Sequence, residues 1–250
     1  MSRAYSADLA YIHNEGFAAS IQQAKAYLLK LIKPRTKLAG SQEKRKPLVV
    51  DLGCGSGIWA RELLRAGYDV LGIDISEPMI RLARKNAPGG HFVKGSIRNF
   101  QLPDCDAVTA LGEVINYCFD PNLTRGELRR LFARVHAALS PGGLFILDFA
   151  GPGRAGPAGV REGFSLGSDW AVLFRVKEDR RRRELRRTIT SFCRVGELYR
   201  RTQEVHKQRL YTPLEVGRQL RQAGFEVKRL EGYGRSRFPG GVTGYAARKM

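Results

Sequence analysis

LVVDLGCGSGIWA, residues 48–60, is the stretch on which the fold prediction depends. Three apolar residues lead into Asp51, glycines follow at positions 53, 55 and 57, and a helical pattern starts directly after them. A buried strand that passes through a glycine-rich turn into the N-terminus of a helix is typical of α/β domains that bind a nucleotide-like molecule. The stretch therefore predicts a fold class and, at the turn, a cofactor site.

Strand and helix patterns alternate through the residues that follow this turn. Short apolar strand patterns are present at 48–53, 69–75, 91–96, 105–112 and 144–150. Helical patterns separate them at 58–67, 76–87 and 123–139. This alternation predicts an α/β fold with a mostly parallel sheet that is covered by helices on both faces.

The residues before this core predict helices and a linker. Apolar residues recur at helical spacing over 6–32, and Asn14-Glu15-Gly16 interrupts them, so we expect two helices. Residues 34–47 are polar and basic, which favours a linker.

The pattern changes again after residue 150. A glycine- and proline-rich loop at 151–163 precedes strand patterns at 170–176, 185–195 and 197–211, which predict an antiparallel meander. The expected organisation is a helical N-terminal cap over 1–40, an α/β domain made of 41–150 and 212–250, and an inserted loop and antiparallel sheet over 151–211 that forms a substrate lid.

Composition narrows the class of protein. No apolar run approaches the ~20 residues of a membrane helix, and the first residues contain no apolar signal-peptide core. The cysteines are scattered without a C-x-x-C pair, at Cys54, Cys105, Cys118 and Cys193. This argues against a disulfide framework and a cysteine zinc site. We therefore expect a cytoplasmic protein without a membrane partner.

The net charge of +19 raises the question of a polyanionic partner. Residues 175–209 contain thirteen Lys and Arg against five Asp and Glu, including the run Arg180–Arg183, which we expect at a solvated hairpin tip. Aromatic residues do not alternate with the basic ones as they do in proteins that stack on nucleic-acid bases. The pattern favours a basic surface over a nucleic-acid partner.

The glycine spacing and two acids indicate which cofactor fits. The spacing G-x-G-x-G lacks the third glycine of the NAD fingerprint, and no Walker loop is present. Asp51 would repel a pyrophosphate but would orient an ammonium group. Asp74 ends the next strand, seventeen positions after Gly57, where an acid accepts ribose hydroxyls. These residues favour a nucleoside cofactor with a cationic amino-acid end.

Four segments of the chain resemble the successive motifs of the class I S-adenosylmethionine-dependent methyltransferases. They are VVDLGCGSG, GIDIS, CDAVTALGEV and LSPGGLFILD. The resemblance is strong over about residues 45–150 and weaker over 212–250. It implies a Rossmann-like sheet of seven strands in the order 3-2-1-4-5-7-6, with strand 7 antiparallel.

The same resemblance implies S-adenosylmethionine as cofactor. Asp51 and the glycines would hold its amino-acid end, Asp74 the ribose, and Ile75 and Met79 the adenine. The full set of expected cofactor-binding residues is Asp51, Gly53, Gly55, Gly57, Asp74, Ile75, Met79, Ser96, Ile97, Leu111, Gly112 and Tyr5. One position departs from the family: Ser96 stands where the third-strand motif usually supplies an Asp to the adenine amine.

Motifs for several acceptors are absent. The segment after the fourth strand reads LGEVINYCFDP, without the Asn/Asp-Pro-Pro-aromatic run of adenine or glutamine N-methylation and without a Pro-Cys pair. No cluster of acids predicts a metal site. These absences favour a metal-independent methyltransferase for N or O of a small molecule, and the expected antiparallel sheet is similar to that of amino-sugar and natural-product N-methyltransferases.

Residues on the acceptor side follow from these placements. The substrate candidates are Glu113, Asn116, Tyr117 and Tyr11, and the candidate bases are His206 and His13. An RNA methyltransferase that binds through the Arg-rich insertion and a non-catalytic cofactor-binding module remain alternatives. The sequence is compatible with a monomer and with a homodimer.

Overall fold

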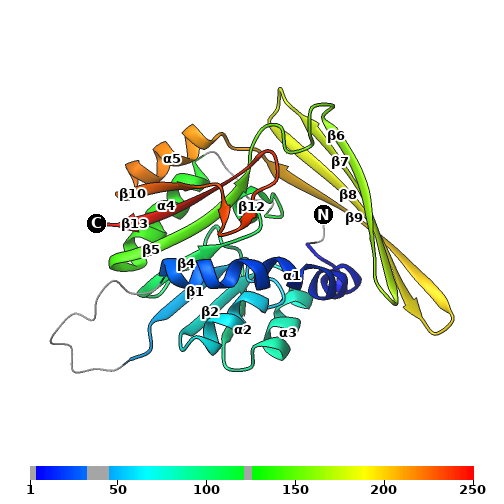
Figure 1. Ribbon diagram of the computed structural model, residues 1–250, viewed down its shortest axis with the longest axis horizontal. Helices are drawn as coiled ribbons and strands as arrows, with labels where there is room; N and C mark the ends of the chain where they lie inside the picture. Colours follow the sequence, from blue (N-terminus) through cyan, green and yellow to red (C-terminus); the bar gives the residue numbers. More distant parts are fainter. Residues whose placement is uncertain (1–3, 33–44, 121–125) are drawn as a thin grey trace.

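The computed structural model describes residues 4–32, 45–120 and 126–250. Seven strands form one sheet in the order β10-β13-β5-β4-β1-β2-β3 (Figure 1). They are β1 (Leu48–Leu52), β2 (Asp69–Asp74), β3 (His91–Lys94), β4 (Cys105–Ala110), β5 (Leu139–Ala150), β10 (Phe225–Leu230) and β13 (Val242–Lys249). β13 is antiparallel to both of its neighbours, and the other pairs are parallel. The predicted α/β class and the order 3-2-1-4-5-7-6 are therefore confirmed.

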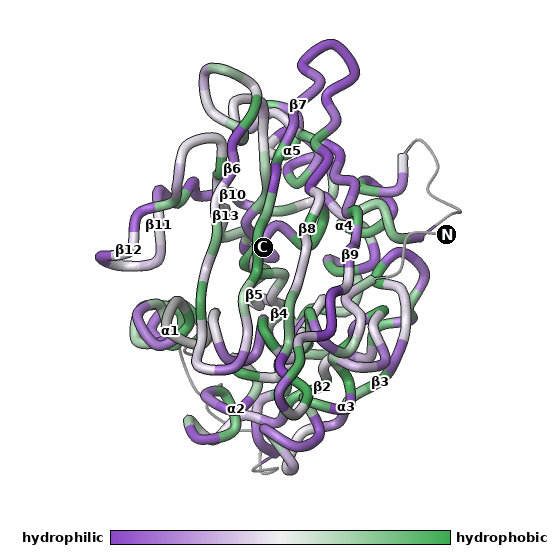
Figure 2. The backbone as a smooth tube through the Cα atoms, turned by 90° about the vertical axis from the view of Figure 1, so that its right-hand side faces the viewer, coloured by the Kyte–Doolittle hydropathy of each residue, from purple (hydrophilic) through white to green (hydrophobic). Residues whose placement is uncertain are grey.

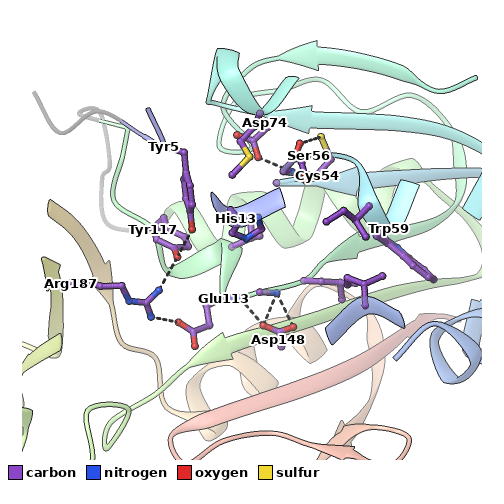
Figure 3. Close-up of a pocket in the computed structure, with 18 of the residues that line it drawn as sticks. Tyr5, His13, Cys54, Ser56, Trp59, Asp74, Glu113, Tyr117, Asp148 and Arg187 are labelled. Atoms are coloured by element: carbon purple, nitrogen blue, oxygen red, sulfur yellow. Dashed lines mark hydrogen bonds and ion pairs between the residues drawn. The ribbon is translucent and has the colours of Figure 1, made fainter. Parts of the chain in front are cut away.

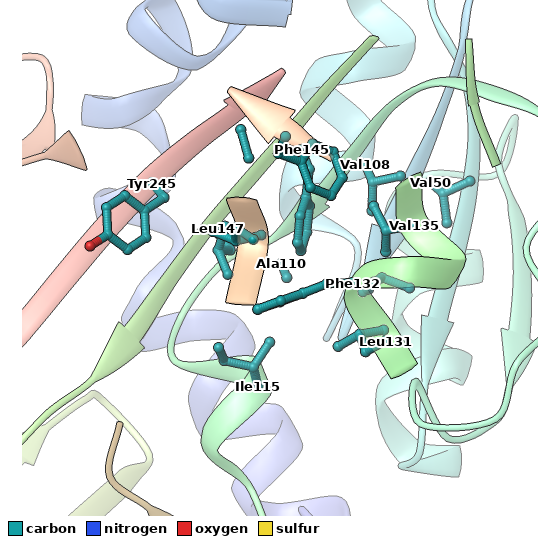
Figure 4. Packing of buried hydrophobic residues seen from close by; sticks show 14 of the residues in the cluster. Val50, Val108, Ala110, Ile115, Leu131, Phe132, Val135, Phe145, Leu147 and Tyr245 are labelled. Atoms are coloured by element: carbon teal, nitrogen blue, oxygen red, sulfur yellow. The ribbon is translucent and has the colours of Figure 1, made fainter. Parts of the chain in front are cut away.

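Helices cover both faces of this sheet. They are α1 (Ala7–Ile32), α2 (Ile58–Arg65), α3 (Glu77–Asn86), α4 (Glu127–Ala138) and α5 (Pro213–Gln222), together with the one-turn helix η1 (Val114–Asn116). Successive strand residues point to opposite faces. Val50 and Phe145 belong to a cluster that includes residues of α4 and α5, and Figure 4 shows them beside α4. Val49 and Ile146 pack with α1, α2 and α3 on the other face.

A second, antiparallel sheet follows β5 in the chain and stands beside the main sheet (Figure 1). Its strands are β6 (Val160–Leu166), β7 (Trp170–Asp179), β8 (Glu184–Val195) and β9 (Leu198–Arg209). The turn between β7 and β8, predicted at Arg180–Arg183, is confirmed, and a later turn at Gly196 joins β8 to β9. The first of them lies in the hydrophilic hairpin beyond β7 in Figure 2.

The N-terminal helix differs from the prediction. α1 is continuous over Ala7–Ile32, so the predicted break at Asn14-Glu15-Gly16 is wrong. A Cβ at Gly16 would lie 3.3 Å from a ring carbon of Trp170, which shows that this glycine allows the helix to approach β7. Of the predicted linker over 34–47, residues 34–44 lie outside the described residues, and residues 45–47 have no regular secondary structure.

Two strand features were not predicted. The loop expected at 151–163 ends earlier, because β6 begins at Val160 and pairs with β7. β6 is an edge strand with no buried residue, so it lacks the alternation that marks a strand in a sequence. A short hairpin of β11 (Gly232–Tyr233) and β12 (Ser236–Arg237) separates β10 from β13. Within the described residues, no helix is both long and apolar enough to span a bilayer.

The glycine turn after β1 is fixed by close packing. Gly57 caps the N-terminus of α2 with a φ of 75°, and a Cβ at this position would lie 2.9 Å from the Cα of Ala83 in α3. Only a glycine tolerates both the positive φ and this distance. The turn therefore brings α2 against α3 and presents its backbone to the carboxyl edge of the sheet.

Gly57→Ala is expected to lower the free energy of unfolding by at least about 2 kcal/mol, because overlap with Ala83 adds to the strain of a positive φ. Gly67→Ala is the matched control: Gly67 has a φ of 89°, but an added Cβ meets nothing within 4 Å, so we expect a loss of about 1 kcal/mol. Urea unfolding of the unliganded protein measures both. Equal losses would contradict a constraint from Ala83.

Candidate active site

A cavity of about 650 Å³ opens at the carboxyl ends of the parallel strands (Figure 3). Its walls come from the glycine turn, the loops after β2, β3 and β4, the N-terminal part of α1, the inner face of β6–β8 and the β11–β12 hairpin. The carboxyl edge is where open α/β sheets bind ligands.

Most of the predicted site residues line this cavity. They are Tyr5, His13, Asp51, Gly53, Gly55, Asp74, Ile75, Met79, Ser96, Ile97, Leu111, Gly112, Glu113 and Tyr117. Four others do not. Gly57 faces α3, and Tyr11 is exposed, with its hydroxyl donating to Asp169 at 3.0 Å. His206 is fully buried behind the wall.

Asn116, the fourth, is fully buried in the framework below the cavity. Its amide nitrogen donates to the carbonyl oxygens of Ala150 at 2.8 Å and Arg209 at 2.6 Å, and its side-chain oxygen accepts from the Ala150 N–H at 2.9 Å. These bonds join η1 to the ends of β5 and β9. The side chain is therefore placed to hold the two sheets together and not to touch a substrate in the cavity.

Two carboxylates flank the glycine turn, that of Asp51, which is buried, and that of Asp74, which is half-buried. Asp51 accepts a hydrogen bond from the hydroxyl of Thr109 at 2.6 Å, and burial raises its pKa to about 7. Asp74 accepts from the backbone N–H of Gly55 at 3.0 Å and of Ser76 at 2.8 Å. Burial also raises the pKa of Asp74, but those backbone bonds oppose the rise. Asp74 thus fixes the turn against β2, and Asp51 is left with a weakly compensated charge.

The residues before α1 close one side of the cavity. The Ser76 hydroxyl donates to the carbonyl oxygen of Tyr5 at 2.9 Å, and the Ser6 N–H donates to Glu204 of β9 at 2.8 Å. The Tyr5 ring centre lies 4.9 Å from that of His206, and its hydroxyl is 3.3 Å from the hydroxyl of Tyr117. This segment therefore connects the end of β2 to the antiparallel sheet.

A network of largely buried charges joins the loop after β4 to β8 of the antiparallel sheet (Figure 3). Glu113 accepts hydrogen bonds from Arg154 at 2.6 Å and Gln208 at 3.0 Å, and it forms an ion pair with Arg187 at 3.5 Å. Burial alone would raise the pKa of Glu113, but the two guanidiniums hold it below its usual value. Glu113 therefore stays ionised and engaged, which makes it a poor proton acceptor.

Asp148, near the end of β5, was missed in the sequence. It accepts from the N–H groups of Gly112 at 3.0 Å and Glu113 at 2.6 Å, and from the hydroxyl of Tyr233 at 2.7 Å. The one signal was an acid inside the apolar run LFILDFA. Its contacts fix the backbone turn after β4, which forms part of the cavity floor.

The two candidate histidines have different surroundings. His13 lines the cavity, and burial lowers its pKa to about 4, so its ring is neutral at pH 7. His206 lies 2.9 Å from a carboxylate oxygen of Glu204 through Nε2 and packs against the rings of Tyr5 and Phe119. Of the two, His13 alone is at the cavity surface.

The chain is similar to methyltransferases along its length. Residues 49–143 match the family model described as a methyltransferase domain. A dTDP-3-amino-3,4,6-trideoxy-alpha-D-glucopyranose N,N-dimethyltransferase of Streptomyces venezuelae is 27% identical over 213 residues, which are 81% of this chain and 82% of that protein. Residues 49–143 therefore carry a methyltransferase domain, in a chain with the class I fold of S-adenosylmethionine-dependent methyltransferases.

Solved structures share the methyltransferase fold over nearly the whole chain. An S-adenosylmethionine-dependent methyltransferase from Clostridium acetobutylicum has a TM-score of 0.78 at 18% identity, covering 96% of this chain and 97% of its own. CalS10, an amino pentose methyltransferase from Micromonospora echinaspora solved with S-adenosylmethionine bound, has a TM-score of 0.73 at 22% identity, covering 100% and 99%.

The chemistry of the cavity fits the cofactor of this methyltransferase. S-adenosylmethionine carries an ammonium group, and no Lys or Arg within the described ranges forms an ion pair with the buried Asp51. A carboxylate whose pKa is raised by burial gains most from a cationic ligand. Across the same described ranges, no three His, Cys, Asp or Glu side chains are grouped as metal ligands.

Cofactor affinity should depend on pH because of Asp51. S-adenosylhomocysteine keeps the ammonium group, and binding it requires ionised Asp51. Its Kd should therefore rise as the pH falls below about 7, by up to about tenfold per pH unit, and stay level above that pH. Calorimetry from pH 5.5 to about 8.5 measures this. 5′-Methylthioadenosine, which lacks the amino-acid end, should show no such slope, and neither should Asp51→Asn. A slope shared by both ligands would point to another group.

Proposed function

We propose that this methyltransferase methylates a nitrogen or oxygen atom of a small, anionic molecule by in-line displacement without a metal ion. The observation that carries the proposal is the roof of the cavity. The inner face of the antiparallel sheet contributes Arg161, Ser165, Val172, Phe174, Arg187 and Ile189 to the same cavity as Asp51 and Asp74. A chamber of about 650 Å³ is in the range of small-molecule sites.

The cofactor would occupy the acidic end of this chamber. Asp51 and the backbone of the glycine turn would hold its amino-acid end, Asp74 would accept from the ribose hydroxyls, and Ile75 and Met79 would pack against the adenine. Bound there, S-adenosylmethionine supplies an electrophilic methyl group. The protein then needs to hold a nucleophile in line with it and to keep water away.

In the proposed mechanism, positioning of the nucleophile contributes more to catalysis than proton transfer does. Glu113 is engaged by Arg154 and Arg187, so it does not serve as base. His13 is neutral and lies at the cavity surface, which makes it the candidate to accept a proton from an acceptor that must lose one. His206 would act indirectly, by packing Tyr5 in place.

The charge of the roof supports an anionic acceptor. Three guanidiniums, from Arg154, Arg161 and Arg187, line the chamber around one carboxylate, that of Glu113. Arg161 lies over the ring of Phe174, 5.5 Å from its centre, and burial followed by the charges of Arg154 and Arg187 lowers its pKa. Guanidiniums in this arrangement are suited to carboxylate or phosphate oxygens.

The similar proteins support the same substrate class. The name of the Streptomyces venezuelae relative specifies an amino sugar joined to dTDP, which brings together an amine nitrogen and a diphosphate. CalS10 is described as an amino pentose methyltransferase. An anionic, amine-bearing small molecule would satisfy both the Arg-lined roof and the requirement for a nucleophile.

A library of small acceptors assayed with radiolabelled S-adenosylmethionine tests the proposal. Arg161→Gln should raise KM for anionic acceptors by about tenfold or more and leave KM for neutral acceptors and the Kd of S-adenosylhomocysteine unchanged. Arg175→Gln is the matched control, because Arg175 pairs with Glu162 on the exposed outer face of the same sheet.

Two results would count against the proposal. Labelling of total RNA in preference to every small molecule would favour the nucleic-acid alternative. An equal rise in KM for Arg161→Gln and Arg175→Gln would show that the basic surface, and not the roof of the chamber, attracts the acceptor.

A further inference from the structure

The loop after β3 has a serine where related methyltransferases usually have an acid for the adenine amine. We propose that Asp120, held in place by Ser96, accepts the 6-amino group of the cofactor's adenine. The acid is thus supplied from the segment after η1 and not from the loop after β3. The inference rests on the proposed cofactor arrangement and is independent of the acceptor.

The hydrogen bonds of Ser96 leave it little capacity to bind adenine itself. Its hydroxyl donates its one proton to Asp120 Oδ2 at 2.8 Å, and its oxygen accepts from the Arg98 N–H at 3.2 Å. A hydroxyl has one donor and two acceptor positions, so the donor is used and one acceptor position is occupied. Ser96 is therefore a positioning residue, and the carboxylate that it orients is the stronger acceptor.

The place of Asp120 in the fold suits this role. Asp120 and Ser96 both line the cavity, together with Ile97, Ile75 and Met79. Ile75, Ser96 and Ile97 follow the ends of β2 and β3, and Met79 is in the first turn of α3. The proposed arrangement puts the adenine at this side of the sheet. The chain after η1 turns back to this point, where Phe119 stacks on Tyr117 with ring centres 4.9 Å apart.

A carboxylate beside the adenine would also determine which nucleobase the protein accepts. A carboxylate has ~4 acceptor positions and no donor, and Ser96 donates to one oxygen of this one. A 6-amino group donates to it favourably. A base with a 6-oxo group would place its own acceptor against the carboxylate, leaving both without a proton between them.

Calorimetry with S-adenosylhomocysteine and its 6-oxo analogue, S-inosylhomocysteine, tests the inference without an acceptor. We expect the wild type to prefer the 6-amino ligand by about 30-fold or more. Asp120→Asn should reduce the preference to within about threefold, because an amide can donate to a 6-oxo group. Asp120→Glu keeps an acceptor and should retain most of the preference.

Two further variants distinguish the effect of the orientation of the Asp120 carboxylate from the effect of its charge. Ser96→Ala should reduce the preference partly, because the carboxylate keeps its charge but loses the bond that orients it. Asp104→Asn removes the same charge from an exposed site ahead of β4, outside the cavity lining, and should change nothing.

An unchanged preference in a folded Asp120→Asn variant would overturn the inference, and thermal unfolding of each variant establishes that it is folded. If the wild type bound neither nucleoside, the proposed cofactor arrangement itself would be wrong. If the wild type bound both ligands equally well, the cofactor site would stand but Asp120 would not read the base.

Discussion

The carboxylate of Asp74 accepts hydrogen bonds from the backbone N–H groups of Gly55 and Ser76, and the shape of the glycine turn depends on this contact. Parallel strands end in turns whose backbone groups face the cavity and need partners. Asp74 at the end of β2 fixes the turn after β1. Asp148 near the end of β5 does the same for the turn after β4, through Gly112 and Glu113. An acid from one strand thus fixes the turn that follows its neighbour.

Charged side chains of opposite sign line different parts of the cavity. Asp51 and Asp74 lie at the glycine turn, whereas Arg154, Arg161 and Arg187 lie under the roof. Burial raises the pKa of Asp51 to about 7, so part of its charge is suppressed when no cation is present. A cationic cofactor would restore that charge, and the acidic end would then discriminate between the cofactor and the proposed anionic acceptor. The two ligands would be sorted to opposite ends by charge.

The parts of the site that could be predicted from the sequence are those formed by residues close to one another along the chain. The glycine turn, Asp51 and Asp74 follow one another at fixed distances along two neighbouring strands, so their meeting could be predicted from the pattern. The network of Glu113 with Arg187 could not be predicted, because it requires the register of β8 against the loop after β4. Tyr11 was expected inside and faces out, since helical spacing alone does not give the rotation of α1.

The same distinction, between local patterns and contacts that depend on the fold, explains why the partner of Ser96 could not be predicted. In the sequence, this serine is a departure from the motif at the position that usually binds the adenine amine, because a motif compares one position at a time. In the fold its hydroxyl lies 2.8 Å from Asp120, so the acid that we propose for the adenine amine comes from another loop. The function of such a loop is constrained by the distance between two side chains and not by either residue type alone. A change at Ser96 therefore has to be judged together with Asp120.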